Sequence, residues 1–234
     1  MNPAERTRIK ICGLTREQDV DAACAAGADA VGFIQYDKSP RYVPIERAAE
    51  LARRLPPFVT PVLLYVNEKP QRVLEALRQI PNAWVQFHGD EGAQQCLDST
   101  VGGLHPYIAV ARIPIDGSPF DLVEFCAAHT HARAVLMDAH VEGFGGAGKA
   151  FDWSRLQTNV DSHLVLSGGL TPANVGDGIV QVRPRCKSLA VDVSSGVEAS
   201  KGVKDPDKIN QFVAAVRAAD ALLAKPAHAL LSAT

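Results

Sequence analysis

A lysine and a cysteine lie two residues apart at the end of the first apolar run of the chain. Lys10 and Cys12 alternate with isoleucines, and Gly13 follows at once, before a segment with helical periodicity. Side chains alternate along a strand, so Lys10 and Cys12 are expected to share a face. A neighbouring ammonium favours the thiolate form of a cysteine. Cys12 is therefore a candidate base, and the alternative is a small buried hydrophobe, which is the usual role of a free cysteine.

A carboxylate ends a later apolar run. Asp138 follows Ala134–Met137 directly. A carboxyl group among apolar walls has a raised pKa, which suits a general acid, whereas the alternative is a turn or helix-capping carboxylate. A cysteine base and a carboxylic acid together indicate proton transfer beside a carbon that bears oxygen or nitrogen, as in an isomerase.

Three further polar residues follow strand-like runs and are candidates for substrate binding: Arg41, His88 and Asp192. A loop guanidinium after a proline suits a substrate carboxylate, and its alternative is a solvated charge. The histidine could donate to a ligand or orient a loop. The aspartate could bond a substrate hydroxyl or tie two loops together.

Glycine and serine clusters follow the last three strand-like runs. Glycines let backbone N–H groups approach an anion, and phosphate commonly binds after the last strands of an α/β barrel. Tight turns also need glycine, so each cluster alone is weak. The candidate phosphate-binding residues are Gly145, Gly146, Gly168, Gly169, Ser194, Ser195 and Gly196.

Short apolar runs alternate with helical patterns along the whole chain. This alternation predicts α/β structure with eight parallel strands closed into a single (β/α)8 TIM barrel over residues 1–234, with a loosely held tail at 225–234. A doubly wound open sheet is the alternative, but its glycine-rich fingerprint does not follow the first strand. The expected strands are Arg8–Cys12, Ala30–Gln35, Thr60–Val66, Trp84–His88, His105–Ala111, Ala134–Asp138, His163–Leu166 and Ser188–Val193. Helices are expected at Glu17–Ala26, Ile45–Leu55, Arg72–Ile80, Pro172–Ile179 and Pro206–Leu223.

Composition narrows the class of protein. A net charge of −2 over 234 residues gives no general attraction to nucleic acid or anionic membranes. The five cysteines show neither paired nor metal-ligand spacing, so we expect a reduced, cytoplasmic protein without a metal site. No signal peptide and no membrane-spanning run are expected. The expected partner is a small molecule.

Six segments of the chain, taken in order, resemble the phosphoribosylanthranilate isomerase family of tryptophan biosynthesis. The segments are Lys10–Thr15, Lys38–Val43, Val85–Gly89, Gly145–Lys149 with Phe151–Trp153, Ser167–Pro172 and Asp192–Glu198. The match extends from about Lys10 to Phe212, and the order of the segments makes it specific.

The resemblance implies an Amadori rearrangement of N-(5-phosphoribosyl)anthranilate to 1-(2-carboxyphenylamino)-1-deoxyribulose 5-phosphate. Asp138 would protonate the ribose ring oxygen, Cys12 would remove the proton from C2, and Arg41 would hold the anthranilate carboxylate. No metal or organic cofactor is implied, and a monomer or homodimer is expected. Gln35 and Ala147 depart from residues common in the family, but neither coincides with the acid or the base.

Three rival interpretations are weaker. A ribulose-phosphate epimerase needs metal ligands that the sequence lacks. The histidine-pathway Amadori isomerase has an aspartate on the first strand, where this chain has Cys12. A non-catalytic phosphoribosyl-binding barrel would be expected to have lost Cys12 or Asp138, and both are present.

Overall fold

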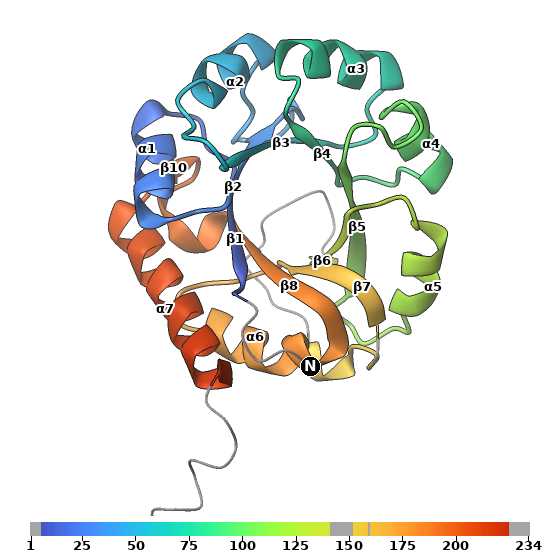
Figure 1. Cartoon of the computed structure of the whole chain (residues 1–234), viewed down its shortest axis with the longest axis vertical. Helices are drawn as coiled ribbons and strands as arrows, with labels where there is room; N and C mark the ends of the chain where they lie inside the picture. Colours follow the sequence, from blue (N-terminus) through green and yellow to red (C-terminus); the bar gives the residue numbers. More distant parts are fainter. Residues whose placement is uncertain (1–5, 141–151, 159, 225–234) are drawn as a thin grey trace, which may run out of the picture.

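Eight parallel strands close into a barrel in chain order, which confirms the predicted (β/α)8 fold (Figure 1). The computed structural model describes residues 6–140, 152–158 and 160–224. Strands β1 and β8 pair with each other and complete the ring. The strands are β1 (Arg8–Cys12), β2 (Ala30–Ile34), β3 (Thr60–Tyr65), β4 (Trp84–Phe87), β5 (Tyr107–Pro114), β6 (Ala134–His140), β7 (Val160–Leu166) and β8 (Cys186–Val193).

Helices surround the strands in an outer layer (Figure 1). They are α1 (Glu17–Ala26), α2 (Ile45–Ala52), α3 (Pro70–Gln79), α4 (Ala93–Asp98), α5 (Leu122–Ala128), α6 (Val175–Val182) and α7 (Pro206–Ala224). Helix α7 packs against both α1 and α6, so the last helix closes the outer layer beside the first. Among the described residues between β6 and β7, the only helical segment is the single 3-10 turn η1 (Trp153–Arg155).

Short elements continue the chain on both sides of β8. The 3-10 turn η2 (Arg183–Arg185) precedes the strand, and η3 (Ser195–Val197) follows it. A small antiparallel hairpin of β9 (Glu198–Ser200) and β10 (Val203–Lys204) then leads into α7. This hairpin was not predicted from the sequence.

The alternation of side chains along the strands divides the core into an outer and an inner part. On β1, Ile9 and Ile11 belong to the large cluster between strands and helices, whereas Cys12 packs inside the barrel with Ile34 and Leu64. Parallel strands buried on both faces need apolar residues on both sides. Inward-facing polar residues on such strands therefore require another explanation, and they gather near the strand ends.

Most predicted bounds of helices and strands agree with the structure within a few residues. The start of α6 differs for a local reason. The helix begins at Val175 rather than at Pro172. The Asn174 side chain accepts a hydrogen bond from the backbone N–H of Thr171 and donates another to the Gly169 carbonyl. These side-chain bonds hold residues 171–174 in a turn that delays the helix.

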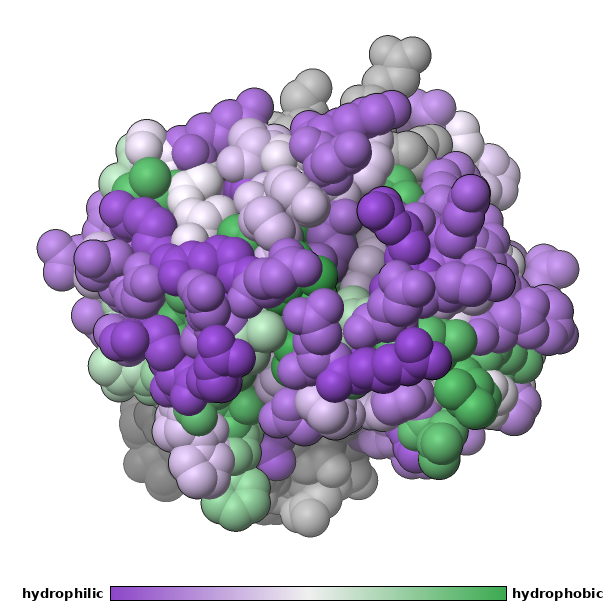
Figure 2. All heavy atoms as spheres, turned by 90° about the horizontal axis from the view of Figure 1, so that it is seen from above, coloured by the Kyte–Doolittle hydropathy of each residue, from purple (hydrophilic) through white to green (hydrophobic). Residues whose placement is uncertain are grey.

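Hydrophilic residues cover most of the face seen in Figure 2, and hydrophobic residues form separate small groups on it. Within residues 6–140, 152–158 and 160–224, no helix combines the length and apolar character needed to cross a bilayer. The predicted loose tail at 225–234 lies outside the described residues.

Candidate active site

A cavity of about 330 Å³ opens at the carboxyl ends of the strands and brings most predicted site residues together. The predicted residues that line it are Cys12, Arg41, His88, Asp138, Gly168, Gly169, Asp192, Ser194 and Ser195. Gly145 and Gly146 lie outside the described residues, as does Ala147. Gly196 does not line the cavity. Functional groups of α/β barrels gather at this end of the strands, because the loops that follow the strands meet there.

Cys12 lines this cavity and is only 4% exposed. Burial raises the pKa of the Cys12 thiol, because a buried thiolate loses its hydration. The Lys10 ammonium lowers that pKa, as predicted, but Asp192 opposes it and the net direction is upward. Lys10 therefore favours the thiolate, as predicted, but burial has the larger effect on the pKa of Cys12.

Lys10 shares the inner face with Cys12, as the alternation predicted, and is paired with Asp192. Its Nζ donates to Asp192 Oδ1 at 2.8 Å, and both side chains are buried. Burial acts to lower the pKa of Lys10, but Asp192 and Cys12 outweigh it and raise this pKa, so the lysine stays charged. The ion pair joins β1 to β8 and leaves Asp192 at the cavity wall.

Gly32 on β2 provides the space that Cys12 and Lys10 occupy. A Cβ atom at this position would lie 2.6 Å from Cys12 Sγ and 3.1 Å from Lys10 Nζ. On the hypothesis that Cys12 is a catalytic base, Gly32→Ala should displace the sulfur and lower kcat on the order of 10²-fold, the loss associated with misplacing a reacting group by about 1 Å. Steady-state kinetics and thermal melting measure the effect.

Gly176→Ala is the matched control, because a Cβ at Gly176 in α6 would meet nothing within 4 Å. That variant should keep full activity and gain slight stability from the better helix propensity of alanine. Equal activity in the two variants would mean that the Cys12 environment does not depend on Gly32.

Asp138 is hydrogen-bonded on both oxygens. His88 Nε2 lies 3.0 Å from Asp138 Oδ2, and the backbone N–H of Ala139 donates to Oδ1. The amide nitrogen of Gln86 lies 3.0 Å from His88 Nδ1, which makes Nδ1 the acceptor and assigns the imidazole proton to Nε2. The surroundings of Asp138 are thus polar, not the apolar walls that the sequence suggested.

Arg41 is a buried residue, not a solvated loop charge. Its Nε and Nη2 donate to the two carboxylate oxygens of Glu198 at 2.7 and 2.8 Å. Arg41 lines the cavity, and the aliphatic part of its side chain packs on Gly13. Gly13 has a φ of 76°, and a Cβ there would lie 2.6 Å from Arg41 Cδ, so glycine is required beside this arginine.

Packing accounts for two of the predicted phosphate glycines. A Cβ on Gly168 would lie 2.6 Å from the backbone nitrogen of Ala139, and one on Gly196 would lie 1.9 Å from the Leu170 carbonyl oxygen. Gly169, with a φ of 66°, and the serines of the β8 loop remain candidates for anion binding. Lys201, from the turn of the β9–β10 hairpin, also lines the cavity.

Sequence reasoning missed Gln86, Glu198 and Lys204. Gln86 is a fully buried polar residue among apolar ones on β4, and its in-phase spacing with His88 was the available signal. Glu198 was part of a matched segment but was given no role, and nothing in the sequence paired it with Arg41.

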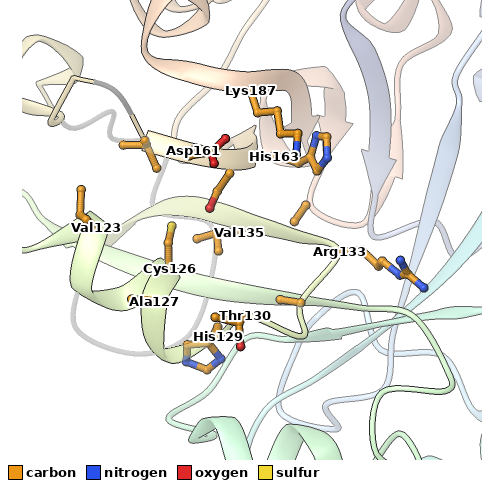
Figure 3. A pocket seen from close by; sticks show the side chains of 14 residues that line it. Val123, Cys126, Ala127, His129, Thr130, Arg133, Val135, Asp161, His163 and Lys187 are labelled. Carbon is orange, nitrogen blue, oxygen red and sulfur yellow. The ribbon is translucent and has the colours of Figure 1, made fainter.

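A separate groove of about 380 Å³ lies beside α5 and carries none of the predicted site residues (Figure 3). Its lining includes Cys126, His129 and Lys187. Among the described residues, no group of three or more histidine, cysteine or acidic side chains is placed to hold a metal ion. The five cysteines are all free.

The family model for N-(5'-phosphoribosyl)anthranilate (PRA) isomerase matches residues 9–215. The chain belongs to the PRA isomerase family. This confirms the resemblance drawn from the six segments, and it makes the chain an isomerase by family. The match includes the strand ends that carry Cys12, Asp138 and Asp192.

Relatives named N-(5'-phosphoribosyl)anthranilate isomerase are similar over almost the whole chain. The protein from Leptothrix cholodnii is 56% identical over 94% of this chain and 95% of its own length. The protein from Dechloromonas aromatica is 56% identical over 92% of this chain and 98% of its own.

Solved structures of PRA isomerases agree in fold. The structure from Thermotoga maritima has a TM-score of 0.76 and 36% identity, covering 91% of this chain and 99% of that chain. A PRA isomerase in complex with reduced 1-(o-carboxyphenylamino)-1-deoxyribulose 5-phosphate has a TM-score of 0.73 and 35% identity, covering 91% of this chain and 99% of that chain.

Proposed function

We propose that this protein isomerises N-(5-phosphoribosyl)anthranilate in tryptophan biosynthesis, with Asp138 as general acid and Cys12 as general base. The observation that carries the proposal is their placement: they come from β6 and β1, yet both line one cavity at the carboxyl ends of the strands. Proton donation and proton abstraction are the two events that an aldose-to-ketose rearrangement needs.

The acid step uses the hydrogen bonds around Asp138. The protonated carboxyl gives its proton to the ribose ring oxygen, the bond from that oxygen to C1 breaks, and a Schiff base forms between C1 and the anthranilate nitrogen. The resulting carboxylate then accepts hydrogen bonds from His88 Nε2 and the Ala139 N–H. Both partners are already in place and stabilise the charge that the step creates.

The base step uses the charges around Cys12. The thiolate takes the proton from C2, and the electron pair of that C–H bond forms the C1=C2 bond of an enolamine while neutralising the Schiff base. The enolamine then gives the C2 ketone by gaining a proton at C1 and losing the hydroxyl proton at C2. Lys10 and Lys204 favour the thiolate and counteract the cost of burial.

Arg41 and the glycine-containing loops bind opposite ends of the substrate. The guanidinium of Arg41 binds the anthranilate carboxylate, and Asp192 bonds a sugar hydroxyl. Gly169, Ser194 and Ser195, assisted by Lys201, bind the phosphate. These residues line one cavity, whose wall carries both the cationic and the backbone donors that a substrate with two anionic groups requires.

The direct test follows the fluorescence of phosphoribosylanthranilate while the purified protein consumes it. We expect a loss of substrate fluorescence that matches the formation of the deoxyribulose product, measured by chromatography. Absence of turnover at micromolar protein, with the protein folded by thermal melting, would refute the proposal.

The phosphate assignment predicts that Gly169→Ala raises KM about tenfold, the effect of losing a hydrogen bond to a charged group. Inorganic phosphate should inhibit the intact enzyme competitively and inhibit this variant less. Gly27→Ala is the control, because Gly27 also has positive φ, at 92°, but a Cβ there meets nothing within 4 Å. An equal rise in KM for both variants would attribute the effect to backbone strain.

We further propose a single-domain cytoplasmic enzyme that acts as a monomer or homodimer and binds neither nucleic acid nor membranes. Free cysteines and the near-neutral net charge support this assignment. One solved relative, from Thermotoga maritima, is a monomer generated from a dimeric PRA isomerase.

A further inference from the structure

The Arg41 guanidinium is hydrogen-bonded to a carboxylate that is distant in the sequence. Glu198 lies 157 positions further along the chain and accepts hydrogen bonds from both Nε and Nη2 of the guanidinium. Arginine has five N–H donors in a planar fork, so this two-point contact fixes the plane of the group and leaves its Nη1 side for a ligand. Arg41 and Glu198 are only 7% and 8% exposed.

A second cation shares the same carboxylate. Lys204 Nζ donates to Glu198 Oε1 at 2.9 Å and to the Ser194 carbonyl at 2.9 Å, and Lys204 is 2% exposed. Two buried cations therefore accompany one carboxylate. The cluster retains net positive charge, which a neutral Arg41–Glu198 pair would lack, and an anionic ligand group can compensate it.

The β9–β10 hairpin places these groups. Glu198 and Lys204 are register partners across the hairpin, so their side chains are neighbours. The turn is attached to the first and second βα loops: Thr15 Oγ1 donates to the Gly202 carbonyl, and a Cβ on Gly202 would lie 3.2 Å from the Pro40 carbonyl oxygen. The hairpin thus contacts the loop that carries Arg41.

We propose that Glu198 and Lys204 are positioning residues that aim the Arg41 guanidinium at the carboxylate of the substrate, and that the β9–β10 hairpin thereby determines the preference for an anionic aromatic amine. This inference rests on the proposed function, in which Arg41 binds that carboxylate. Neither Glu198 nor Lys204 is assigned contact with the reacting atoms.

The test compares two ligands in binding calorimetry: the reduced product analogue with its ring carboxylate, and the same compound without it. The intact protein should prefer the first. Glu198→Gln places an amide N–H₂ group where two cations need an acceptor, so it should reduce this preference about ten- to hundredfold, the effect of losing charge-assisted hydrogen bonds. Affinity for the ligand without the carboxylate should stay within about threefold, a margin below the loss of one such bond.

Kinetics and control variants distinguish a role in positioning Arg41 from a general loss of protein stability. In Glu198→Gln, KM should rise while kcat stays nearly constant. In the Arg41→Met background, Glu198→Gln should cause no further loss of preference, because it acts only through Arg41. Glu50→Gln removes an exposed carboxylate that also pairs with an arginine, Arg47, and should change neither quantity. If Glu198→Gln fails to fold, Lys204→Met measures the same preference, which should again fall.

The outcomes distinguish this inference from the proposed function. An intact protein that neither isomerises the substrate nor prefers the carboxylated ligand overturns both. The positioning role alone is overturned if the intact protein does both and Glu198→Gln either keeps its preference or binds both ligands more weakly by the same factor.

Discussion

Cys12→Ser should lower kcat by about 10²–10⁴-fold, the contribution typical of a positioned general base. A hydroxyl is a much weaker base than a thiolate, and the substitution keeps the size and place of the side chain. The thermal midpoint should change little, because the new oxygen lies near Lys10, which can donate to it. Single-turnover and steady-state assays measure the loss.

Cys126→Ser provides the control for cysteine loss in general. Cys126 is half-buried on α5 and lines the groove in Figure 3, away from the candidate active site. This variant should keep the activity of the intact protein. Near-normal activity in Cys12→Ser would instead remove Cys12 from the mechanism.

The same residue predicts a pH dependence. The base form is the thiolate, which appears as pH rises through the pKa of Cys12, and burial raises that pKa above the usual value of a thiol. In the intact protein, the rate at which iodoacetamide alkylates Cys12, followed by peptide mass spectrometry, should therefore keep rising with pH beyond the ordinary titration range of cysteine. An alkylation rate that levels off within the ordinary range would contradict a raised pKa for Cys12.

Asp138→Asn should also abolish measurable turnover, because an amide cannot give a proton to the ring oxygen. The amide oxygen can still accept the hydrogen bond from His88 Nε2, so the cavity should keep its shape. A reduced product analogue should bind the variant within a few-fold of the intact protein, as measured by calorimetry.

His88 offers the comparison for Asp138. His88→Asn should lower kcat less than Asp138→Asn, since it removes a group that stabilises the carboxylate and leaves the acid itself. If the analogue no longer binds Asp138→Asn, then Asp138 is a binding or structural group and not the acid.

The barrel and the end of it that carries the candidate site could be predicted from the sequence, because both depend on the local order of apolar and polar residues. Apolar runs ending in polar residues define strand ends, and a closed parallel barrel brings all such ends together. Chemistry at Cys12, Asp138 and Arg41 could therefore be located before any contact was known. The cavity confirms that these residues lie together, while their roles remain predictions.

Contacts across the barrel could not be predicted in this way. Glu198 meets Arg41 only because a hairpin after β8 folds back over the second βα loop, and that geometry leaves no periodic signal. The net direction of the shift in the pKa of Cys12 could not be predicted either. The sequence indicates that Lys10 lies near Cys12, but not how completely the two side chains are buried. Burial determines the direction of the shift in the pKa of Cys12.

The ion pair between Lys10 and Asp192 has a consequence for how the enzyme is made. Its two residues are separated by 182 positions, and they meet only where the first strand pairs with the eighth. During synthesis, β1 emerges early and stays an open edge until β8 has left the ribosome. Glu198 and Lys204 arrive later still. Activity in a translating extract should therefore appear only after almost the entire chain is complete, which makes turnover a direct readout of barrel closure.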